Sequence, residues 1–231
     1  MNILIVLTSH DELGDTGEKT GFWLEELAAP YYVLKDAGHR LALASPKGGK
    51  PPLDPRSDSE DSQTEDTKRF KNDPEAQQAL ATTKLLSEMN PADFDAVFYP
   101  GGHGPLWDLA SSEDSKRIVE GTLRSGKPVA LVCHAPAVLK IVENEEGKPI
   151  VEGRKVTGFT NEEEEQVGLT DVVPFLLEDC LKQQGAEWSQ GGVFAEHVVA
   201  DGLLITGQNP PSSGPTAQAL CKALAAKGEY A

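Results

Sequence analysis

Hydrophobic and polar positions along the first 45 residues form blocks that predict a strand, a helix and a second strand. Residues 3–7 are a continuous apolar run rich in β-branched side chains, which predicts a strand buried on both faces. Apolar positions at helical spacing cover residues 20–37 and end at Gly38, so we expect a helix there. Residues 40–44 predict a second short strand. Such a unit implies parallel strands joined by a right-handed crossover.

The same pattern returns after residue 95 and continues almost to the end of the chain. It predicts strands at 96–99, 129–132, 198–199 and 203–206, and helices at about 112–125 and 218–226. Residues 48–90 interrupt it with a pair of prolines, many acidic side chains and few apolar ones. We interpret them as a rim insertion of loops and short helices, with the acidic side chains on a solvated face. The sequence therefore predicts one α/β domain over 1–231, a doubly wound sandwich with a mainly parallel central sheet.

The acidic composition narrows the range of partners that we expect. The 231 residues include 21 Lys and Arg against 37 Asp and Glu, a formal net charge of −16. A surface of that sign repels phosphate backbones and anionic lipids, so we expect no nucleic-acid partner and no membrane partner. No apolar run approaches the roughly 20 residues that span a bilayer, and the N-terminus lacks the features of a signal peptide. Three cysteines without paired spacing favour a cytoplasmic protein without a disulfide framework.

The strongest candidate for chemistry is Cys133, which directly follows the predicted strand at 129–132. Small and helix-starting residues come next, so the segment predicts a nucleophile elbow that lifts one side chain clear of a sheet edge. A helix beginning at this point would also lower the pKa of the thiol. The alternative is a buried structural cysteine. Cys180 and Cys221 fit that alternative, because each lies on an apolar stripe at helical spacing.

A glycine-rich loop, Tyr-Pro-Gly-Gly-His-Gly at 99–104, follows another predicted central strand. The carboxyl ends of the strands are where open α/β sheets bind ligands. Glycines let the backbone approach a ligand closely, and the N–H groups of Gly102 and His134 would together form an oxyanion hole. The alternative for any Gly-Gly pair is a tight turn that requires a positive φ.

Three motifs in combination resemble one family. The first helical region begins Thr20-Gly21 and carries Glu25-Glu26, the glycine loop reads Pro-Gly-Gly-His-Gly, and the elbow reads Val-Cys-His-x-Pro. Together they resemble the ThiJ/PfpI superfamily, which implies a flavodoxin-like sandwich and a catalytic cysteine. The insertion after the second strand and the segment 156–160 are similar to its branch of heat-shock chaperones and glyoxalase III. The resemblance extends from the first strand to about residue 210.

The resemblance also implies the roles of individual residues. It implies a nucleophile, a glutamate that touches the thiol, a histidine next to the nucleophile, an acid that orients this histidine, and two residues that bind substrate or oxyanion: Cys133, Glu26, His134, Glu164, Gly102 and His103. Glu25 is the surface neighbour of Glu26 on the expected helix. Ala135 stands where the family commonly has glycine, and its methyl group would narrow the pocket or stiffen the elbow.

The identity of the orienting acid stays open, because residues 162–165 are four consecutive glutamates. Thr160 and Glu163 also fit a capping box, so part of this run is expected to cap the N-terminus of a helix. The neighbouring glutamates therefore remain alternatives to Glu164 as the partner of His134.

The activity implied by the resemblance is that of a glutathione-independent glyoxalase of type III. Such an enzyme, a lyase of the D-lactate dehydratase type, converts methylglyoxal into lactate through a hemithioacetal with Cys133, and activity on glycated proteins accompanies it. We expect a small 2-oxoaldehyde substrate, a homodimer and no cofactor. The chain has no Cys-x-x-Cys or His-x-x-x-His spacing, so we expect no metal.

Two alternatives to the glyoxalase stay open. One is a cysteine amidase or peptidase, whose glutaminase version is disfavoured because the order Glu196-His197 reverses the late histidine and glutamate it needs. The other is a non-catalytic stress holdase or redox sensor that uses Cys133 as an oxidisable thiolate.

Several further motifs carry no prediction of function. Residues 121–127 match a phosphate-binding P-loop until Pro128, but they connect a helix to a strand and therefore predict a helix C-cap. No Gly-x-Gly-x-x-Gly is present. His10, His39 and His197 are scattered, and we expect them on the surface or in the core.

Overall fold

A seven-stranded sheet in the order β3-β2-β1-β4-β5-β9-β8 forms the centre of the computed structural model. The structure describes residues 1–228, so residues 229–231 of the predicted domain lie outside it. The strands of this sheet are β1 (Asn2–Val6), β2 (Arg40–Ser45), β3 (Lys84–Leu85), β4 (Ala96–Tyr99), β5 (Val129–Val132), β8 (Val198–Asp201) and β9 (Leu204–Gly207). All neighbours are parallel except β8, which pairs antiparallel with β9. The predicted α/β sandwich with a mainly parallel sheet is confirmed.

The strand order creates a switch point at the middle of the sheet. β1 pairs with β2 on one side and with β4 on the other, in the registers Ile3↔Leu41 and Ile3↔Ala96. The chain therefore adds β2 and β3 on one side of β1, and then adds β4 and the later strands on the other side of β1. Residues 3–6, all of β4 and all of β5 are buried, as their continuous apolar runs predict. Ligands of open α/β sheets bind beyond the carboxyl ends of strands at such a point.

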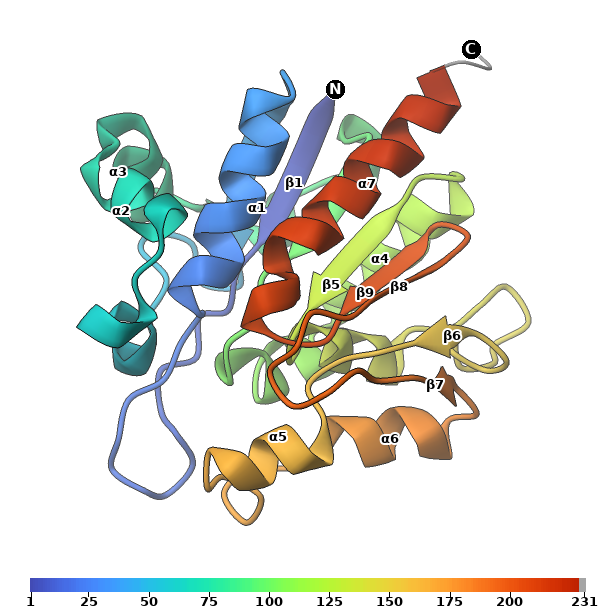
Figure 1. Cartoon of the computed structure of the whole chain (residues 1–231). Coiled ribbons are helices and arrows are strands. Elements are labelled where there is room, and N and C mark those ends of the chain that lie inside the picture. Colours follow the sequence, from blue (N-terminus) through green and yellow to red (C-terminus); the bar gives the residue numbers. More distant parts are fainter. Residues whose placement is uncertain (229–231) are drawn as a thin grey trace.

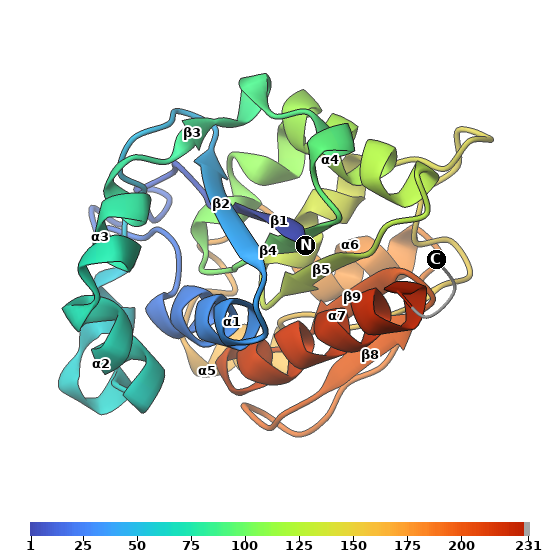
Figure 2. The same cartoon turned by 90° about the horizontal axis from the view of Figure 1, so that it is seen from above.

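Helices cover both faces of the sheet. On one face α1 (Leu24–Asp36) and α7 (Ser213–Gly228) lie side by side, and α4 (Glu113–Arg124) packs on the opposite face (Figures 1 and 2). The helix predicted at 112–125 is confirmed, with the side chain of Ser112 capping its first turn. One hydrophobic cluster extends through both faces from Ile3 to Leu224.

The first helix begins four residues later than its predicted start at Thr20. Phe22 pairs instead with the insertion, because its N–H donates to the Pro52 carbonyl (2.9 Å) and its own carbonyl accepts from the N–H of Asp54 (2.9 Å). This extended pairing uses backbone groups that a helix would need for its own hydrogen bonds. α1 therefore begins only at Leu24.

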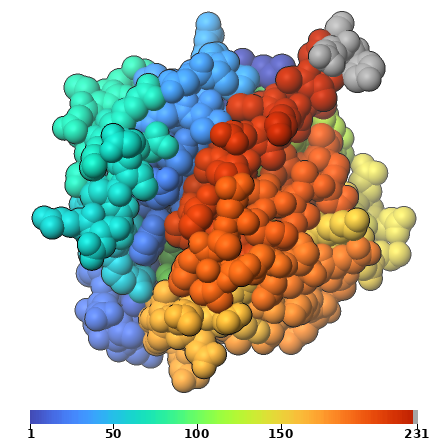
Figure 3. Space-filling view, viewed as in Figure 1, coloured from blue at the N-terminus to red at the C-terminus, as the bar shows by residue number. Residues whose placement is uncertain are grey.

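The insertion at 48–90 consists largely of loops and short helices, as predicted. Its helices α2 (Glu65–Asn72) and α3 (Pro74–Ala81) come next to each other in the chain, and α2 packs against α1 at the side of the molecule (Figure 3). β3 adds a two-residue strand to the edge of the sheet beside β2, which the sequence did not predict because the strand is too short for a periodic pattern. The expectation of a wholly solvated acidic face is wrong at Asp54, whose side chain is fully buried.

A second, two-stranded sheet and two short helices complete the carboxyl half of the chain. β6 (Lys155–Val156) pairs in parallel with β7 (Glu187–Trp188), and α5 (Asn161–Gln166) and α6 (Leu177–Gln183) lie between them in the sequence. The prediction that Cys180 and Cys221 are core residues is wrong, because each is only partly buried, although Cys221 packs against the core. None of the helices within residues 1–228 is both long enough and apolar enough to cross a membrane.

Candidate active site

Cys133 lies directly after β5 in a strained backbone conformation. Its φ of 63° belongs to the left-handed region, which residues other than glycine rarely adopt. Two backbone hydrogen bonds hold this conformation: the N–H of Cys133 donates to the Gly207 carbonyl, and the N–H of Phe159 donates to the Cys133 carbonyl, both at 2.9 Å. The sharp turn separates the side chain from the strand, as the nucleophile-elbow motif predicts.

The predicted lowering of the thiol pKa is not found. A seven-residue 3₁₀ helix, Ala135–Ile141, follows Cys133 in place of an α-helix. Burial raises the pKa of the Cys133 thiol well above its usual range, and the neighbouring Glu26 carboxyl raises it further. Because the thiol is only 4% exposed, loss of water outweighs what a short helix terminus can contribute.

Glu26 projects from the first turn of α1 towards the thiol. Its side chain is fully buried, and burial raises its pKa to about 8, against the opposing effect of its contact with Cys133. Neither carboxyl oxygen has a partner at full hydrogen-bond geometry within residues 1–228. Glu25 points elsewhere, as predicted, and accepts a hydrogen bond from the Thr64 hydroxyl at 2.5 Å. A buried, unpartnered carboxyl beside a thiol is a candidate general acid or base.

The glycine loop after β4 brings backbone against both groups. A Cβ at Gly101 would overlap the Glu26 carboxyl and lie 2.9 Å from Cβ of Cys133, so only glycine fits. Gly102 has a φ of +96°, and its N–H faces the Cys133 sulfur. Within residues 1–228 the N–H groups of Gly102 and His134 donate to no backbone carbonyl. Neither N–H is therefore committed to secondary structure among these residues, so both can serve an oxyanion.

His134 connects the thiol to a buried carboxylate. Its Nε2 lies 2.7 Å from Oε2 of Glu164, and its Nδ1 lies 3.4 Å from the sulfur of Cys133. A carboxylate only accepts hydrogen bonds, so Nε2 carries the hydrogen, and in the neutral ring Nδ1 is then an acceptor facing the thiol. The arrangement suits a base that takes the proton of Cys133.

His103 binds the other oxygen of the same carboxylate. Its Nε2 lies 2.6 Å from Oε1 of Glu164, and its ring packs 4.0 Å from the ring of His134. Burial lowers the pKa of His103 to about 4, and the neighbouring His134 adds to the effect. Burial alone would raise the pKa of Glu164, but the two histidines hold it well below its usual range. A neutral His103 and an ionised Glu164 thus fix the orientation of His134.

The structure distinguishes the four consecutive glutamates. Glu164 is the one that reaches the histidines, whereas Glu163 forms the predicted capping box with Thr160. The buried carboxyl of Glu163 also accepts hydrogen bonds from the side chains of Gln208 (3.1 Å) and Asn209 (2.9 Å). Glu162 and Glu165 are exposed. Of these two adjacent residues of α5, Glu164 contacts the histidines of the site and Glu163 supports the local structure.

His103, His134 and Glu164 also form the one group among the described residues whose spacing could hold a metal ion, with donor atoms within 4.8 Å of one another. Their separations of 2.6 and 2.7 Å are those of hydrogen bonds between the histidines and the carboxylate. The three side chains are thus joined by hydrogen bonds, and the expectation of no metal stays a prediction.

These groups open into a cavity of about 180 Å³. It is lined by Trp23, Glu26, Arg56, Gly102, His103, Cys133, His134, Phe159, Val167, Phe194 and Pro210. Five of the six predicted site residues therefore line it, and Glu164 stands behind the two histidines. Arg56 and the aromatic wall carry no distinct sequence signal. Arg56 lies within the acidic insertion at 48–90, and Phe159 belongs to the segment 156–160 but has no reactive group of its own.

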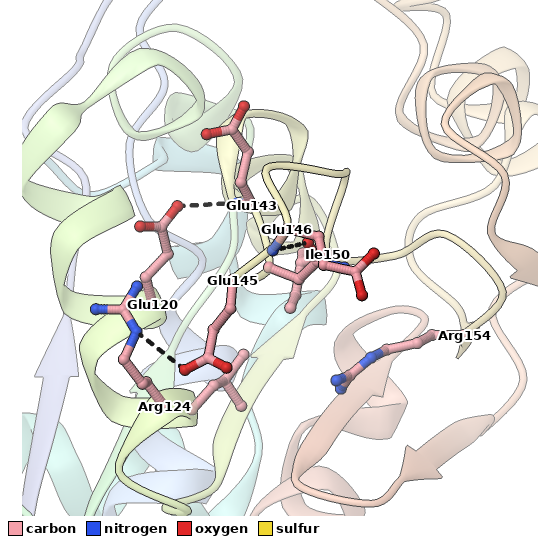
Figure 4. A pocket seen from close by; sticks show the side chains of 9 residues that line it. Glu120, Arg124, Glu143, Glu145, Glu146, Ile150 and Arg154 are labelled. Atoms are coloured by element: carbon pink, nitrogen blue, oxygen red, sulfur yellow. Dashed lines mark hydrogen bonds and ion pairs between the residues drawn. The ribbon is translucent and has the colours of Figure 1, made fainter.

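A larger cavity, of about 400 Å³, lies away from this site beside α4 (Figure 4). Glutamates and arginines line most of it, and the Arg124 side chain pairs across it with Glu145 at 3.8 Å. It contains no cysteine or histidine. We therefore assign the chemistry to the smaller cavity, where a nucleophile and two titratable groups meet.

The motifs that were set aside lie outside the site. His10 stacks on Trp107 with a centroid distance of 5.0 Å, and His197 contacts the hydroxyl of Ser189. Neither of these histidines nor His39 lines the cavity. The segment resembling a P-loop ends α4, with Gly126 at a φ of 68°, and the predicted helix C-cap is confirmed.

The doubly wound sheet and the strand-end cysteine place the chain in the class of α/β proteins that present a side chain on a sharp turn at the carboxyl edge of a parallel sheet. More particularly, the chain belongs to the DJ-1/PfpI family, whose model matches residues 19–223.

Several relatives cover nearly the whole chain. "Glyoxalase 3" of Candida albicans is 31% identical over 226 residues, covering 94% of this chain and 96% of that protein. "Glutathione-independent glyoxalase HSP31" of Saccharomyces cerevisiae is 31% identical over 224 residues, covering 93% and 94%. The crystal structure of glyoxalase III from Candida albicans superimposes with a TM-score of 0.90 at 31% identity, covering 96% of this chain and 97% of that one. The structure of Rapid Encystment Protein 24 KDa from Francisella tularensis superimposes with a TM-score of 0.92 at 36% identity, covering 96% and 98%.

Proposed function

We propose that the chain is a glutathione-independent glyoxalase that converts methylglyoxal into lactate. The observation that carries the proposal is the meeting of three groups on one cavity of about 180 Å³: the thiol of Cys133, Nδ1 of His134 and the carboxyl of Glu26. A small 2-oxoaldehyde needs a nucleophile for its aldehyde carbon and a base for the hydrogen on that carbon. The names of the relatives in Candida albicans and Saccharomyces cerevisiae support the same activity.

The first step is addition of sulfur to the aldehyde carbon. His134 accepts the thiol proton at Nδ1 as the C–S bond forms and the carbonyl oxygen becomes an alkoxide. The N–H groups of Gly102 and His134, which donate to no backbone carbonyl among the described residues, are available to stabilise that oxygen. Return of the proton from His134 to the oxygen gives a neutral hemithioacetal.

The second step moves a proton between two carbons. Ionised Glu26 removes the hydrogen from the carbon that carries sulfur, giving an enediolate, and the hydroxyl proton on that carbon moves to the oxygen of the neighbouring carbon. Glu26 then returns its proton to the neighbouring carbon, and the carbon that carries sulfur regains its C=O bond. The product is a thioester of lactic acid on Cys133. A carboxyl with a pKa of about 8 suits this work, because it can both take and return a proton near neutral pH.

The last step is hydrolysis. Water adds to the thioester carbon, the C–S bond breaks, the sulfur recovers its proton, and lactate leaves. The overall change is the addition of one water to methylglyoxal, so the atoms balance without glutathione, an oxidant or a reductant.

The two alternatives fit the site less well. An amidase or peptidase would use Cys133, His134 and Glu164, but it has no need of the buried Glu26 beside the thiol. A redox sensor needs an accessible cysteine of low pKa, whereas this thiol is 4% exposed with a raised pKa. These observations favour the glyoxalase.

Other expectations stay predictions. They are the single domain over 1–231, the homodimer, the cytoplasmic location, the D-lactate dehydratase stereochemistry, the activity on glycated proteins and the holdase activity.

A methylglyoxal consumption assay without glutathione tests the proposal, with lactate identified by chiral chromatography. We expect consumption that is proportional to enzyme and matched by lactate formation. Absence of lactate above the rate without protein would reject the glyoxalase. Hydrolysis of amide or peptide substrates by the same preparation would then favour the hydrolase.

A further inference from the structure

Arg56 is held at the edge of the active-site cavity by a buried aspartate. Its Nε donates to Oδ1 of Asp54 at 3.0 Å and its Nη2 to Oδ2 at 2.6 Å, which is a two-point contact with a fixed geometry. Asp54 is fully buried and also accepts a hydrogen bond from the hydroxyl of Thr20 at 2.9 Å. The guanidinium is therefore positioned before any ligand arrives.

The other side of this guanidinium is available to a ligand. Arg56 lines the cavity, and its side chain remains 37% exposed. Nη2 also lies 3.4 Å from Nδ1 of His103, on the ring that faces the site. Within residues 1–228, Nη1 has no hydrogen-bond acceptor. Its two N–H groups are donors of the kind that bind carboxylates.

Among the residues that line the cavity, Arg56 is the one permanent cation. Burial keeps His103 neutral at pH 7, since its pKa is lowered to about 4. Burial also keeps Glu26 mostly protonated, since its pKa is raised to about 8. The chain as a whole carries a net charge of −16, so its surface repels anions in general. An anion that enters this cavity therefore meets a positioned guanidinium, although the net charge of the protein is strongly negative.

We propose that Arg56 is a specificity-determining residue whose Nη1 binds the carboxylate of a small 2-hydroxy acid in the active-site cavity. The inference rests on the proposed function, because hydrolysis of the thioester releases this class of anion beside Cys133. It goes beyond that function in assigning a carboxylate subsite. Two consequences follow: the product competes with the aldehyde, and an uncharged analogue of the product binds more weakly.

Titration of the ¹⁵N-labelled protein with sodium D-lactate and sodium L-lactate, followed by NMR, tests the subsite without any turnover. Lactamide is the uncharged control of matched shape. We expect lactate to shift the Nε–H signal of Arg56 and the backbone amide of Gly102, with at least ~10-fold weaker binding of lactamide. We expect R56Q to bind lactate at least ~10-fold more weakly than wild type.

Arg69→Gln is the matched control, because Arg69 forms a similar two-point contact with Asp36 on the exposed surface, at 2.7 and 2.9 Å. We expect it to bind lactate like wild type. Arg56→Lys keeps a positive charge beside Asp54 but loses the planar guanidinium and its paired N–H donors. It therefore tests whether Arg56 binds the carboxylate if R56Q does not fold. We expect Arg56→Lys to bind at least ~3-fold more weakly than wild type.

The possible outcomes separate the two proposals. Equal binding of lactate and lactamide, or lactate binding unchanged in both Arg56 variants, would overturn the subsite even if methylglyoxal is turned over. Lactate binding that depends on Arg56, in a protein without glyoxalase activity, would support the subsite and reject the function. Where turnover exists, lactate should inhibit wild type competitively and R56Q at least ~10-fold less.

Discussion

The sulfur of Cys133 lies 3.4 Å from Nδ1 of His134, although the two residues are adjacent in the chain. Neighbouring side chains on a strand point to opposite faces, so this contact requires the chain to leave β5 sharply. The φ of 63° at Cys133 produces that turn, and the Gly207 carbonyl and the Phe159 N–H hold it. The strained backbone of Cys133 thus brings its thiol and the ring of His134 together.

Replacement of the nucleophile tests covalent catalysis. We expect C133S to fold normally and to lose at least ~90% of kcat/KM for methylglyoxal, because a hydroxyl is a far weaker nucleophile at neutral pH. That loss corresponds to about 1.4 kcal/mol or more of transition-state stabilisation. Steady-state kinetics provide the measurement, with C221S as the control, because Cys221 lies on α7 and does not line the cavity. Retention of more than about a tenth of the activity by C133S would rule out a covalent thiol mechanism.

Removal of the proposed base tests proton transfer separately. E26Q keeps the shape of the side chain but cannot accept the substrate proton, so we expect lactate formation to fall at least ~10²-fold. Cys133 should still react with iodoacetamide, which mass spectrometry can follow. The control is E25Q, since Glu25 accepts a hydrogen bond from Thr64, the N-cap residue of α2, and does not line the cavity. A near wild-type rate in E26Q, with a loss in E25Q, would transfer the role of base to Glu25.

The pH dependence of the rate follows from the same pair. Both the thiol and Glu26 have pKa values raised by burial, that of Glu26 to about 8. Below pH 8 Glu26 is mostly protonated and cannot remove the substrate proton, so we expect kcat/KM to rise with pH from 6 to 8, by up to about tenfold per unit. Initial rates in buffers of constant ionic strength measure this. A profile that is flat over that range would show that no group with a pKa near 8 limits the reaction.

The shared carboxylate behind the histidines provides a fourth prediction. Glu164 is a positioning residue, because it acts through His134 and does not line the cavity. In E164Q the amide cannot accept from both rings as a charged carboxylate does, so we expect kcat/KM to fall ~10²-fold and the His134 ring to change tautomer. ¹⁵N NMR of the histidine rings reports the tautomer. E162Q, on the exposed side of the same helix, should change neither readout.

The contact between the glycine loop and Glu26 provides a fifth prediction. At Gly101 an added methyl group would overlap the Glu26 carboxyl, so we expect G101A to lose about 1–3 kcal/mol of unfolding free energy together with most of its activity. Urea denaturation measures the stability. The control is G214A, where the nearest heavy atom to a new Cβ is 4.0 Å away. Equal stability of the two variants would contradict the close packing at Gly101.

Patterns of neighbouring residues in the sequence predicted much of the fold and the position of Cys133 at the end of a strand. The strands β1, β4 and β5 could be predicted, because a strand that is buried on both faces is continuously apolar in sequence. The sharp turn at Cys133 could be predicted, because a strand, a cysteine and helix-starting residues follow one another directly in the sequence. The Gly-Gly pair and the placement of Glu26 were also predicted, the latter through the family resemblance. These features depend on residues close together in the chain.

Only the tertiary structure decided how distant residues pair. Glu164 is joined to His134 across 30 positions and to His103 across 61, and nothing in four consecutive glutamates distinguishes the one that turns inward. Asp54 and Arg56 looked like part of a solvated charge run until packing against Thr20 buried the aspartate. The pKa of the Cys133 thiol is likewise raised by burial and by the neighbouring Glu26, which is distant in the sequence. Burial and neighbouring charge are properties of the assembled core, and a sequence motif specifies neither.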